Sequence, residues 1–269
     1  MNNLNIHPTA IVNKKAIIDE SAEIGPYSII GENVSIGRDV KIHAHVVIDG
    51  YTSIDEGTEI YPFAAIGLKC QDLKYKGEKS ILSIGKNCQI REHATMHPGT
   101  NHGGGETIVG DNCLLMIGTH IAHDCILGNN IIMANNATLG GHVIIENNAI
   151  IGGLSAVQQF SRIGEGSMLG GMSGIKGDLI PFGIVKNTIG DLAGLNVIGM
   201  RRAGISNEEI RCSQKLYDIL FNENDNRTIN EIISSDEAIE LSKNCEPVQK
   251  IINFIKNKSK RPLCRPKKD

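Results

Sequence analysis

The chain has 269 residues, no Trp, few aromatic residues and a formal net charge of −3. This charge balance gives no general case for binding nucleic acid or an anionic membrane surface. The sequence contains no stretch of 18 apolar residues and no basic N-terminal region followed by an apolar one, so neither a membrane span nor a signal peptide is expected.

Aliphatic residues recur at every sixth position, in three runs. This period suits neither an α-helix, with about 3.6 residues per turn, nor a strand, with a period of about 2. It is typical of a hexapeptide β-helix, in which each hexad forms one side of a coil and its aliphatic side chain points inward. The runs comprise Ile6, Val12, Ile18, Ile24, Ile30, Ile36, Ile42, Ile48, Ile54, Ile60 and Ile66; Ile84, Ile90 and Met96; and Val109, Leu115, Ile121, Leu127, Met133, Leu139, Ile145, Ile151, Val157, Ile163, Leu169 and Ile175.

The residue four places after each aliphatic one is mostly small or β-branched, as a narrow, closely packed prism requires. Cys88, Cys113 and Cys125 occupy this inward position, so buried thiols and a reducing cytoplasm are expected. Glycine often follows the aliphatic residue, as at Gly25 and Gly31, and we expect it to supply the backbone angles of the corners.

Two polar segments interrupt the hexads, at residues 67–83 and 101–107. Insertions into a solenoid become loops on one face, often the binding face, although a tolerated surface loop is the alternative. The pattern predicts a β-helix domain over residues 1–190 and a helical domain with a basic tail over residues 191–269. Helix starts are expected at Ser206, Thr228 and Pro247.

We expect this helical domain to cap the open end of the solenoid. The basic tail from Lys256 to Lys268 is predicted to be a solvated, disordered end, with attraction of an acidic partner as the alternative.

Histidines gather where the repeat is most regular. A coil of three hexads has 18 residues, so Asp124 and His142 are predicted to occupy the same corner of adjacent coils, about one strand spacing apart. His123 is predicted to face outward as a general base, with Asp124 or a backbone carbonyl fixing its tautomer. The backbone near Gly140 and Gly141 can approach a ligand closely and is a candidate oxyanion hole. These features favour direct acyl transfer to a hydroxyl or amine.

Three alternatives stay open at this point. His120, His123 and His142 offer a zinc site like that of the γ-class carbonic anhydrases, which share the repeat, although the spacing of His120 and His123 differs from that class. A non-enzymatic β-helix would not need these histidines grouped at one level. An N-acyltransferase of the same hexapeptide-repeat superfamily would carry an additional domain before its hexads, which here begin at Ile6.

The sequence resembles the UDP-N-acetylglucosamine O-acyltransferases that begin lipid A synthesis. The resemblance rests on residues 121–125 (IAHDC), 134–142 (ANNATLGGH), 150–157 (IIGGLSAV) and 71–75 (QDLKY), and it begins within residues 2–12. It implies a left-handed parallel β-helix, a homotrimer with active sites between subunits, and no metal or other cofactor. The implied substrates are a 3-hydroxyacyl chain on acyl carrier protein and the glucosamine 3-position of UDP-N-acetylglucosamine.

The resemblance also implies roles for individual residues. His123, Asp124 and Gly141 are implied as the base, its support and the oxyanion donor. The implied substrate contacts are Asp72, Lys74, His97, His120, His142, Asn196 and Arg202. Gly171 matches the position that gauges acyl length, and glycine there predicts a long chain. One position departs: Gln158 stands where the family commonly has His, so transfer to a 3-amino sugar, giving an amide, is an alternative.

Overall fold

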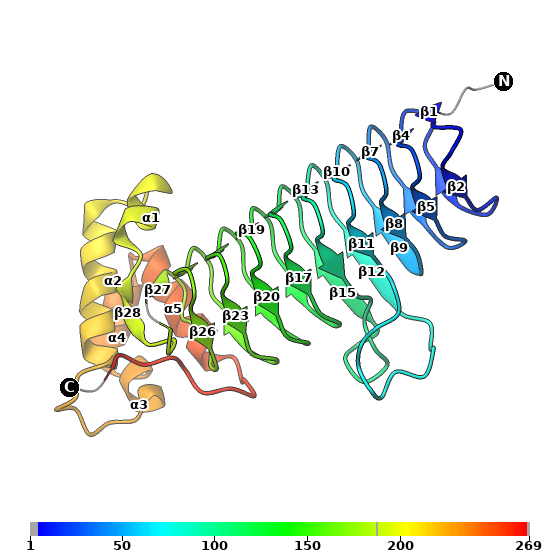
Figure 1. Ribbon diagram of the computed structural model, residues 1–269. Coiled ribbons are helices and arrows are strands. Elements are labelled where there is room, and N and C mark those ends of the chain that lie inside the picture. The colour runs from blue at the N-terminus through cyan, green and yellow to red at the C-terminus, as the bar shows by residue number, and fades with distance from the viewer. Residues whose placement is uncertain (1–4, 187, 268–269) are drawn as a thin grey trace.

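The computed structural model describes residues 5–186 and 188–267 of the chain. Residues 1–4, where the family resemblance begins, and Lys268 of the tail lie outside the described residues. Short parallel strands stack coil upon coil into three sheets along a long solenoid, and helices pack at its C-terminal end (Figure 1). The predicted hexapeptide β-helix with a helical C-terminal region is therefore confirmed.

Each coil contributes one strand to each of three sheets. The first sheet contains β1 (Asn5–Ile6), β4 (Glu23–Ile24), β7 (Lys41–Ile42), β10 (Glu59–Ile60), β13 (Gln89–Ile90), β16 (Leu114–Leu115), β19 (Ile132–Met133), β22 (Ile150–Ile151), β25 (Met168–Leu169), β27 (Gly183–Val185) and β28 (Leu192–Leu195). The second contains β2 (Ile11–Val12), β5 (Ile29–Ile30), β8 (Val47–Ile48), β11 (Ala65–Ile66), β14 (Thr95–Met96), β17 (His120–Ile121), β20 (Thr138–Leu139), β23 (Ala156–Val157) and β26 (Gly174–Ile175). The third contains β3 (Ile17–Ile18), β6 (Ser35–Ile36), β9 (Tyr51–Ile54), β12 (Ile81–Ile84), β15 (Glu106–Val109), β18 (Ile126–Leu127), β21 (Ile144–Ile145) and β24 (Arg162–Ile163).

The aliphatic residues at the sixth positions form the core. From Ile24 to Ile175 they are almost completely buried, and strand pairing aligns them in ladders such as Ile121 with Leu139. The inward thiols of Cys88, Cys113 and Cys125 are buried as predicted. Burial of one such aliphatic side chain stabilises the fold by roughly 1.5–3 kcal/mol, so the repeat contributes to the stability of every coil.

The three edges of the prism turn on residues with positive φ, and most of them are not glycine. Edge 1 lies between the first and the second sheet along the chain. Edge 2 leads from the second sheet to the third, and edge 3 leads from the third sheet back to the first. The glycines after the aliphatic residues act differently from what the sequence predicted: a Cβ on Gly25 would lie 2.7 Å from the carbonyl carbon of His43 in the next coil. Their role is close approach between coils, whereas the left-handed turn falls two residues later, for example on Tyr27.

Both insertions leave the solenoid at edge 2, on consecutive coils. In the structure the first insertion belongs to the connection from β11 to β12. The second belongs to the connection from β14 to β15, which begins before the predicted range and includes Thr100. They extend from the solenoid side by side (Figure 1). A backbone N–H of the second, at Asn101, donates to the Glu78 carboxylate of the first at 3.4 Å. The two insertions therefore cover one part of one edge.

Five helices follow β28: α1 (Val197–Arg202), α2 (Asn207–Leu220), α3 (Ile229–Ile233), α4 (Asp236–Ser242) and α5 (Glu246–Lys256). Ser206 and Thr228 form capping boxes, and Pro247 lies in the first turn of α5, so all three predicted helix starts are confirmed. The prediction of helix from Asp191 was wrong for residues 192–195, because this segment instead pairs antiparallel with β27 and buries Leu192 and Leu195.

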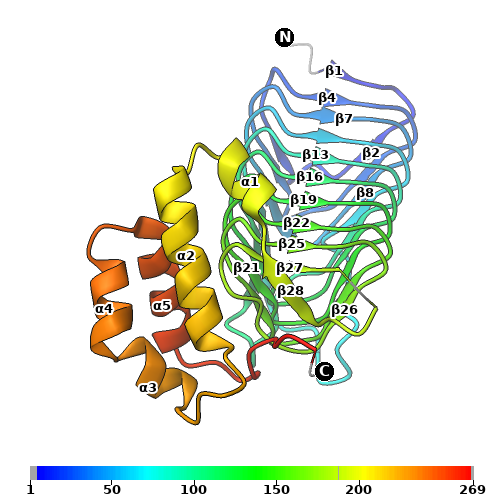
Figure 2. The ribbon, with the colours of Figure 1, turned by 90° about the vertical axis from the view of Figure 1, so that its left-hand side faces the viewer.

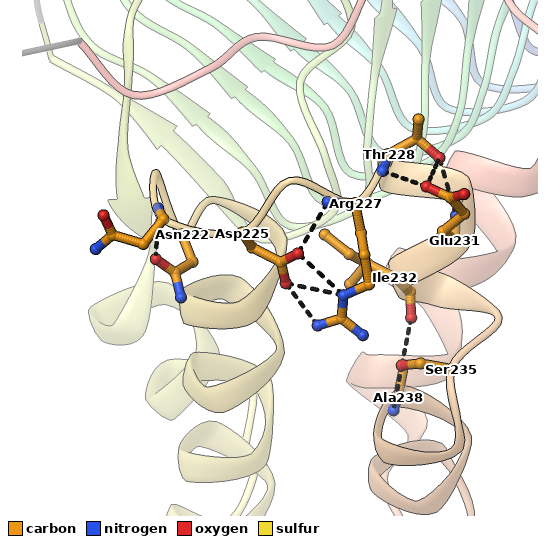
Figure 3. Close-up of polar contacts among 9 residues, drawn as sticks. Asn222, Asp225, Arg227, Thr228, Glu231, Ile232, Ser235 and Ala238 are labelled. Carbon is orange, nitrogen blue, oxygen red and sulfur yellow. Dashed lines mark hydrogen bonds and ion pairs between the residues drawn. The ribbon is translucent and has the colours of Figure 1, made fainter.

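Local hydrogen bonds define the turns of the helical domain (Figure 3). The Thr228 hydroxyl accepts from the Glu231 N–H at 3.2 Å, and the Glu231 carboxylate accepts from the Thr228 N–H at 2.6 Å. Asp225 accepts from the Arg227 guanidinium just before this cap, and the Ser235 hydroxyl accepts from the N–H of Ala238 at the start of α4. Such capping contacts fix where each short helix begins.

The helical domain lies beside the last coils rather than across the end of the solenoid, as Figure 2 shows. Lys250 of α5 pairs with Glu165 at 2.9 Å, and the Arg162 guanidinium lies over the Phe254 ring. None of the described helices has the length and the run of apolar residues that a membrane crossing requires.

The tail prediction of a disordered end was wrong for the described residues. After α5 the chain returns to the solenoid, where the Cys264 N–H donates to the Asp178 carbonyl at 2.8 Å. The Arg261 guanidinium donates to the Gln159 carbonyl at 2.9 Å. These bonds and the burial of Cys264 hold the tail against the last coils.

Candidate active site

His123 and Asp124 follow β17 at edge 2, directly beside the coils that carry the two insertions. The Asp124 side chain is completely buried, and one of its carboxylate oxygens, Oδ2, accepts from His123 Nδ1 at 2.7 Å. A carboxylate can only accept, so Nδ1 carries the proton and Nε2 presents a lone pair. The arrangement gives His123 the tautomer that a general base at Nε2 requires.

His142 lies one coil further along the same edge, as predicted. The backbone N–H of His142 donates to the His123 carbonyl at 3.0 Å, and the ring Nδ1 of His142 is 3.7 Å from Asp124 Oδ2. Burial is the main cause that lowers the pKa of His142, although Asp124 opposes the shift. Burial, with the neighbouring His97 and His123, likewise lowers the pKa of His120. Both rings are therefore held in the neutral form near neutral pH.

Gly141 lies against the imidazole of His123. A Cβ at this position would be 2.5 Å from Cε1 and 2.6 Å from Nε2 of the ring, closer than real Cβ atoms approach. Only glycine therefore allows the backbone at 141 to pass next to the basic nitrogen of His123. Gly141, which carries a backbone N–H, therefore lies beside His123 Nε2, the atom that would receive a proton.

The first insertion contributes Asp72 and Lys74. The Lys74 N–H donates to Asp72 at 2.9 Å and is the main cause that lowers the pKa of Asp72, with a smaller contribution from His123. His97 is buried, and its Nδ1 donates to the Lys69 carbonyl at 3.0 Å. His97 thus links the first insertion to the coil. The centroids of the His97 and His120 rings are 5.4 Å apart.

The remaining predicted site residues lie elsewhere in the chain. Gln158 is exposed at edge 2, two coils beyond His123, whereas Gly171 lies at edge 1. Asn196 and Arg202 line a cavity of about 780 Å³ between α1, α5 and the first sheet. The Asn196 side chain caps α1 and donates to the Gly166 carbonyl at 3.1 Å. One chain therefore does not bring all the predicted residues together.

Sequence reasoning missed two features of the site. The hydroxyl and the N–H of Thr100, in the second insertion, each donate to the Asp124 carboxylate at 2.7 Å. Phe160 stacks on His142 with ring centroids 4.3 Å apart, and Lys260 of the tail lies over the Phe160 ring. The hexad register carries no signal for contacts made by an insertion or by the tail.

His123, Asp124 and His142 each offer one metal-ligand atom, and these atoms lie within 4.8 Å of one another. Both Asp124 oxygens, however, accept hydrogen bonds from Thr100, and one also accepts from His123. A divalent cation would have to displace the His123 bond. The Asp124 carboxylate is therefore better suited to accept a hydrogen bond from His123 Nδ1 than to bind a metal cation.

Comparisons with known proteins identify the family of the chain. The family described as UDP N-acetylglucosamine O-acyltransferase, domain 2, matches residues 178–264, and the bacterial transferase hexapeptide family matches residues 15–50 and 106–141. The acyl-(acyl-carrier-protein)–UDP-N-acetylglucosamine O-acyltransferase of Bartonella henselae is 44% identical over 99% of this chain and 96% of its own. That of Rhizobium johnstonii is 40% identical over 97% and 94%.

Solved structures give the same result over the whole fold. The UDP-N-acetylglucosamine O-acyltransferase of Moraxella catarrhalis superposes with a TM-score of 0.92 at 42% identity, covering 97% of this chain and all of its own. The UDP-N-acetylglucosamine acyltransferase of Francisella novicida gives a TM-score of 0.91 at 33% identity, covering 97% and 94%. Full-length identity at this level, together with the helical domain, separates the chain from the zinc hydratases and from a structural solenoid. The chain therefore belongs to the family of acyl-(acyl-carrier-protein)–UDP-N-acetylglucosamine O-acyltransferases.

Proposed function

We propose that this protein transfers a 3-hydroxyacyl chain from acyl carrier protein to the 3-hydroxyl of the glucosamine in UDP-N-acetylglucosamine, the first step of lipid A synthesis. The observation that carries the proposal is the His123–Asp124 pair beside Gly141. The relatives' names supply the two substrates. The pair supplies the chemistry that joins them, because a hydroxyl becomes a good nucleophile when a base removes its proton.

The mechanism follows from the hydrogen bonds of His123. Its Nε2 takes the proton of the acceptor hydroxyl while the oxygen attacks the thioester carbonyl, and Asp124 stabilises the imidazolium that forms. The N–H of Gly141 donates to the oxyanion. The intermediate then expels the carrier thiolate, which takes the proton back from the imidazolium. The products are a sugar ester and the free thiol of the carrier, and His123 returns to its starting form.

The acceptor is tested by offering both sugars at once. Purified enzyme is incubated with 3-hydroxymyristoyl carrier protein, UDP-N-acetylglucosamine and its 3-amino analogue, and the products are separated by mass spectrometry. Ester on the hydroxyl sugar is the expected result, because the relatives are named as O-acyltransferases of UDP-N-acetylglucosamine. Amide alone would reassign the acceptor and leave the roles of His123 and Asp124 in place.

We further propose that the enzyme works as a homotrimer. Edge 1 exposes a column of stacked rings, in which the ring centroid of Phe63 lies 5.2 Å from those of His45 and His93. Tyr27, Phe63, Leu154 and Met172 of this edge are each more than half exposed. Such an apolar column is typical of a protein–protein contact. A neighbouring subunit at this edge also explains why Gly171 and Arg202 lie away from His123 in one chain.

Phe63→Glu is expected to convert the trimer into monomers, because a carboxylate in the ring column would be desolvated at the contact. Light scattering after size-exclusion chromatography measures the mass. Lys86→Glu, an exposed change at edge 3, is the matched control and is expected to stay trimeric. A trimeric Phe63→Glu variant would place the subunit contact on another face.

Gly171→Met is expected to shift the acyl preference from long chains to chains of ten carbons or fewer. A Cβ at Gly171 would meet only the Gly153 carbonyl, at 3.4 Å, so the backbone accepts a side chain there without strain. The added side chain would fill space that a long acyl chain uses. Competition among carrier-bound 3-hydroxyacyl chains, read by mass spectrometry, measures the preference. An unchanged preference for long chains would remove Gly171 from this role.

A further inference from the structure

The second insertion closes directly over the Asp124 carboxylate. The Thr100 N–H donates to Oδ1 at 2.7 Å and the Thr100 hydroxyl donates to Oδ2 at 2.7 Å. Gly103 packs so closely that a Cβ on it would be 2.0 Å from the Asp124 Cγ. The insertion therefore holds both oxygens of the carboxylate and excludes water from it.

Thr100 also begins the turn that follows it. Its carbonyl accepts from the N–H groups of Gly103 and Gly105 at 3.0 and 2.8 Å, and Thr100 itself is buried. The turn is thus closed on one side by backbone bonds and fastened on the other side to Asp124. This leaves the hydroxyl little freedom to rotate away from Oδ2.

Oδ2 is the same oxygen that accepts from His123 Nδ1. Two donors on one oxygen fix the rotation of the carboxylate, and that rotation sets the plane in which His123 lies. We propose that Thr100 is a positioning residue for acyl transfer, which orients His123 through Asp124; this inference rests on the proposed role of His123 as the base. A misplacement of about 1 Å at such a group can cost on the order of 10²-fold in rate.

The Thr100 hydroxyl also withdraws negative charge from the oxygen that faces the imidazole. Without it, Oδ2 directs more charge to His123 and favours the protonated ring, so the acid limb of the pH–rate profile moves to higher pH. The charged or titratable groups that interact with the pair stay the same in the variants: Asp72 of the first insertion, His120 of β17 and His142 of the next coil. Lys74 and His102 act on Asp72, and Lys260 of the tail acts on His142.

The test compares Thr100→Val with Thr100→Ser in the full-length enzyme. Valine keeps the shape and loses the hydroxyl, so kcat/KM is expected to fall by about 10- to 100-fold, with the acid limb at higher pH. Serine keeps the hydroxyl and is expected to stay within about threefold of wild type with an unmoved acid limb. Thr58→Val is the matched control. Thr58 is a buried threonine whose hydroxyl donates to the Gly85 carbonyl, away from the site.

The control separates positioning from stability. Thr58→Val is expected to lower Tm to a similar extent as Thr100→Val without moving the acid limb. Wild-type kcat/KM and pH profile in Thr100→Val, alongside an inactive His123→Ala, would overturn the positioning role and leave the proposed function intact. A serine variant as impaired as the valine variant would also overturn it. A fully active His123→Ala would instead overturn the proposed function on which the inference rests.

Discussion

His123→Ala is expected to lower kcat for acyl transfer by 10²- to 10⁴-fold, the usual contribution of a general base. The imidazole presents its Nε2 lone pair because Nδ1 is bonded to the buried Asp124 carboxylate. The neighbouring His142 is not expected to replace it, since its Nδ1 lies 3.7 Å from the carboxylate and makes no hydrogen bond with it. Initial rates with saturating carrier-bound substrate measure the loss.

The matched control is His7→Ala, which removes an exposed imidazole from the first coil. We expect this control to keep wild-type kcat. His123→Ala is expected to keep the Tm and the oligomeric mass of the wild type, because its ring lies outside the aliphatic core. Activity of His123→Ala within a few-fold of wild type would show that another group removes the proton.

Gly141→Ala is the second change with a large expected effect, a loss of about 10²-fold or more in kcat. The new methyl group would lie 2.5 Å from Cε1 and 2.6 Å from Nε2 of His123, so the ring has to move away from the position that the Asp124 bond gives it. The same shift changes the distance between the base and the N–H proposed to bind the oxyanion. The loss is expected in kcat more than in KM, because both interactions form in the transition state.

Gly174→Ala provides the control for adding a methyl group to the solenoid. A Cβ at Gly174 would meet only the Thr188 carbonyl, at 3.5 Å, which is ordinary contact. This control is expected to keep both activity and Tm. A Gly141→Ala enzyme with wild-type kcat would show that the His123 ring is free to move without consequence, which the proposed mechanism does not allow.

The solenoid and part of the site could be predicted from the sequence because a coil has a fixed length. Eighteen residues per coil place Asp124 beside His142, and the structure confirms this neighbourhood. The same periodicity predicted the buried thiols, and the local sequence predicted the helix starts at Ser206 and Thr228, where the structure has capping boxes. These are local or strictly periodic signals, for which sequence distance translates directly into spatial distance.

Only the tertiary structure decided what covers the Asp124 carboxylate and where the tail lies. Thr100 directly precedes the predicted second insertion, so its distance from Asp124 depends on the path of the loop that follows it. Lys260 reaches Phe160 because the chain turns back after α5, which no composition rule for a basic tail predicts. The periodic part of this protein was therefore determined by its sequence pattern, whereas the contacts that orient the base arise from aperiodic segments whose course is set by packing against the coils.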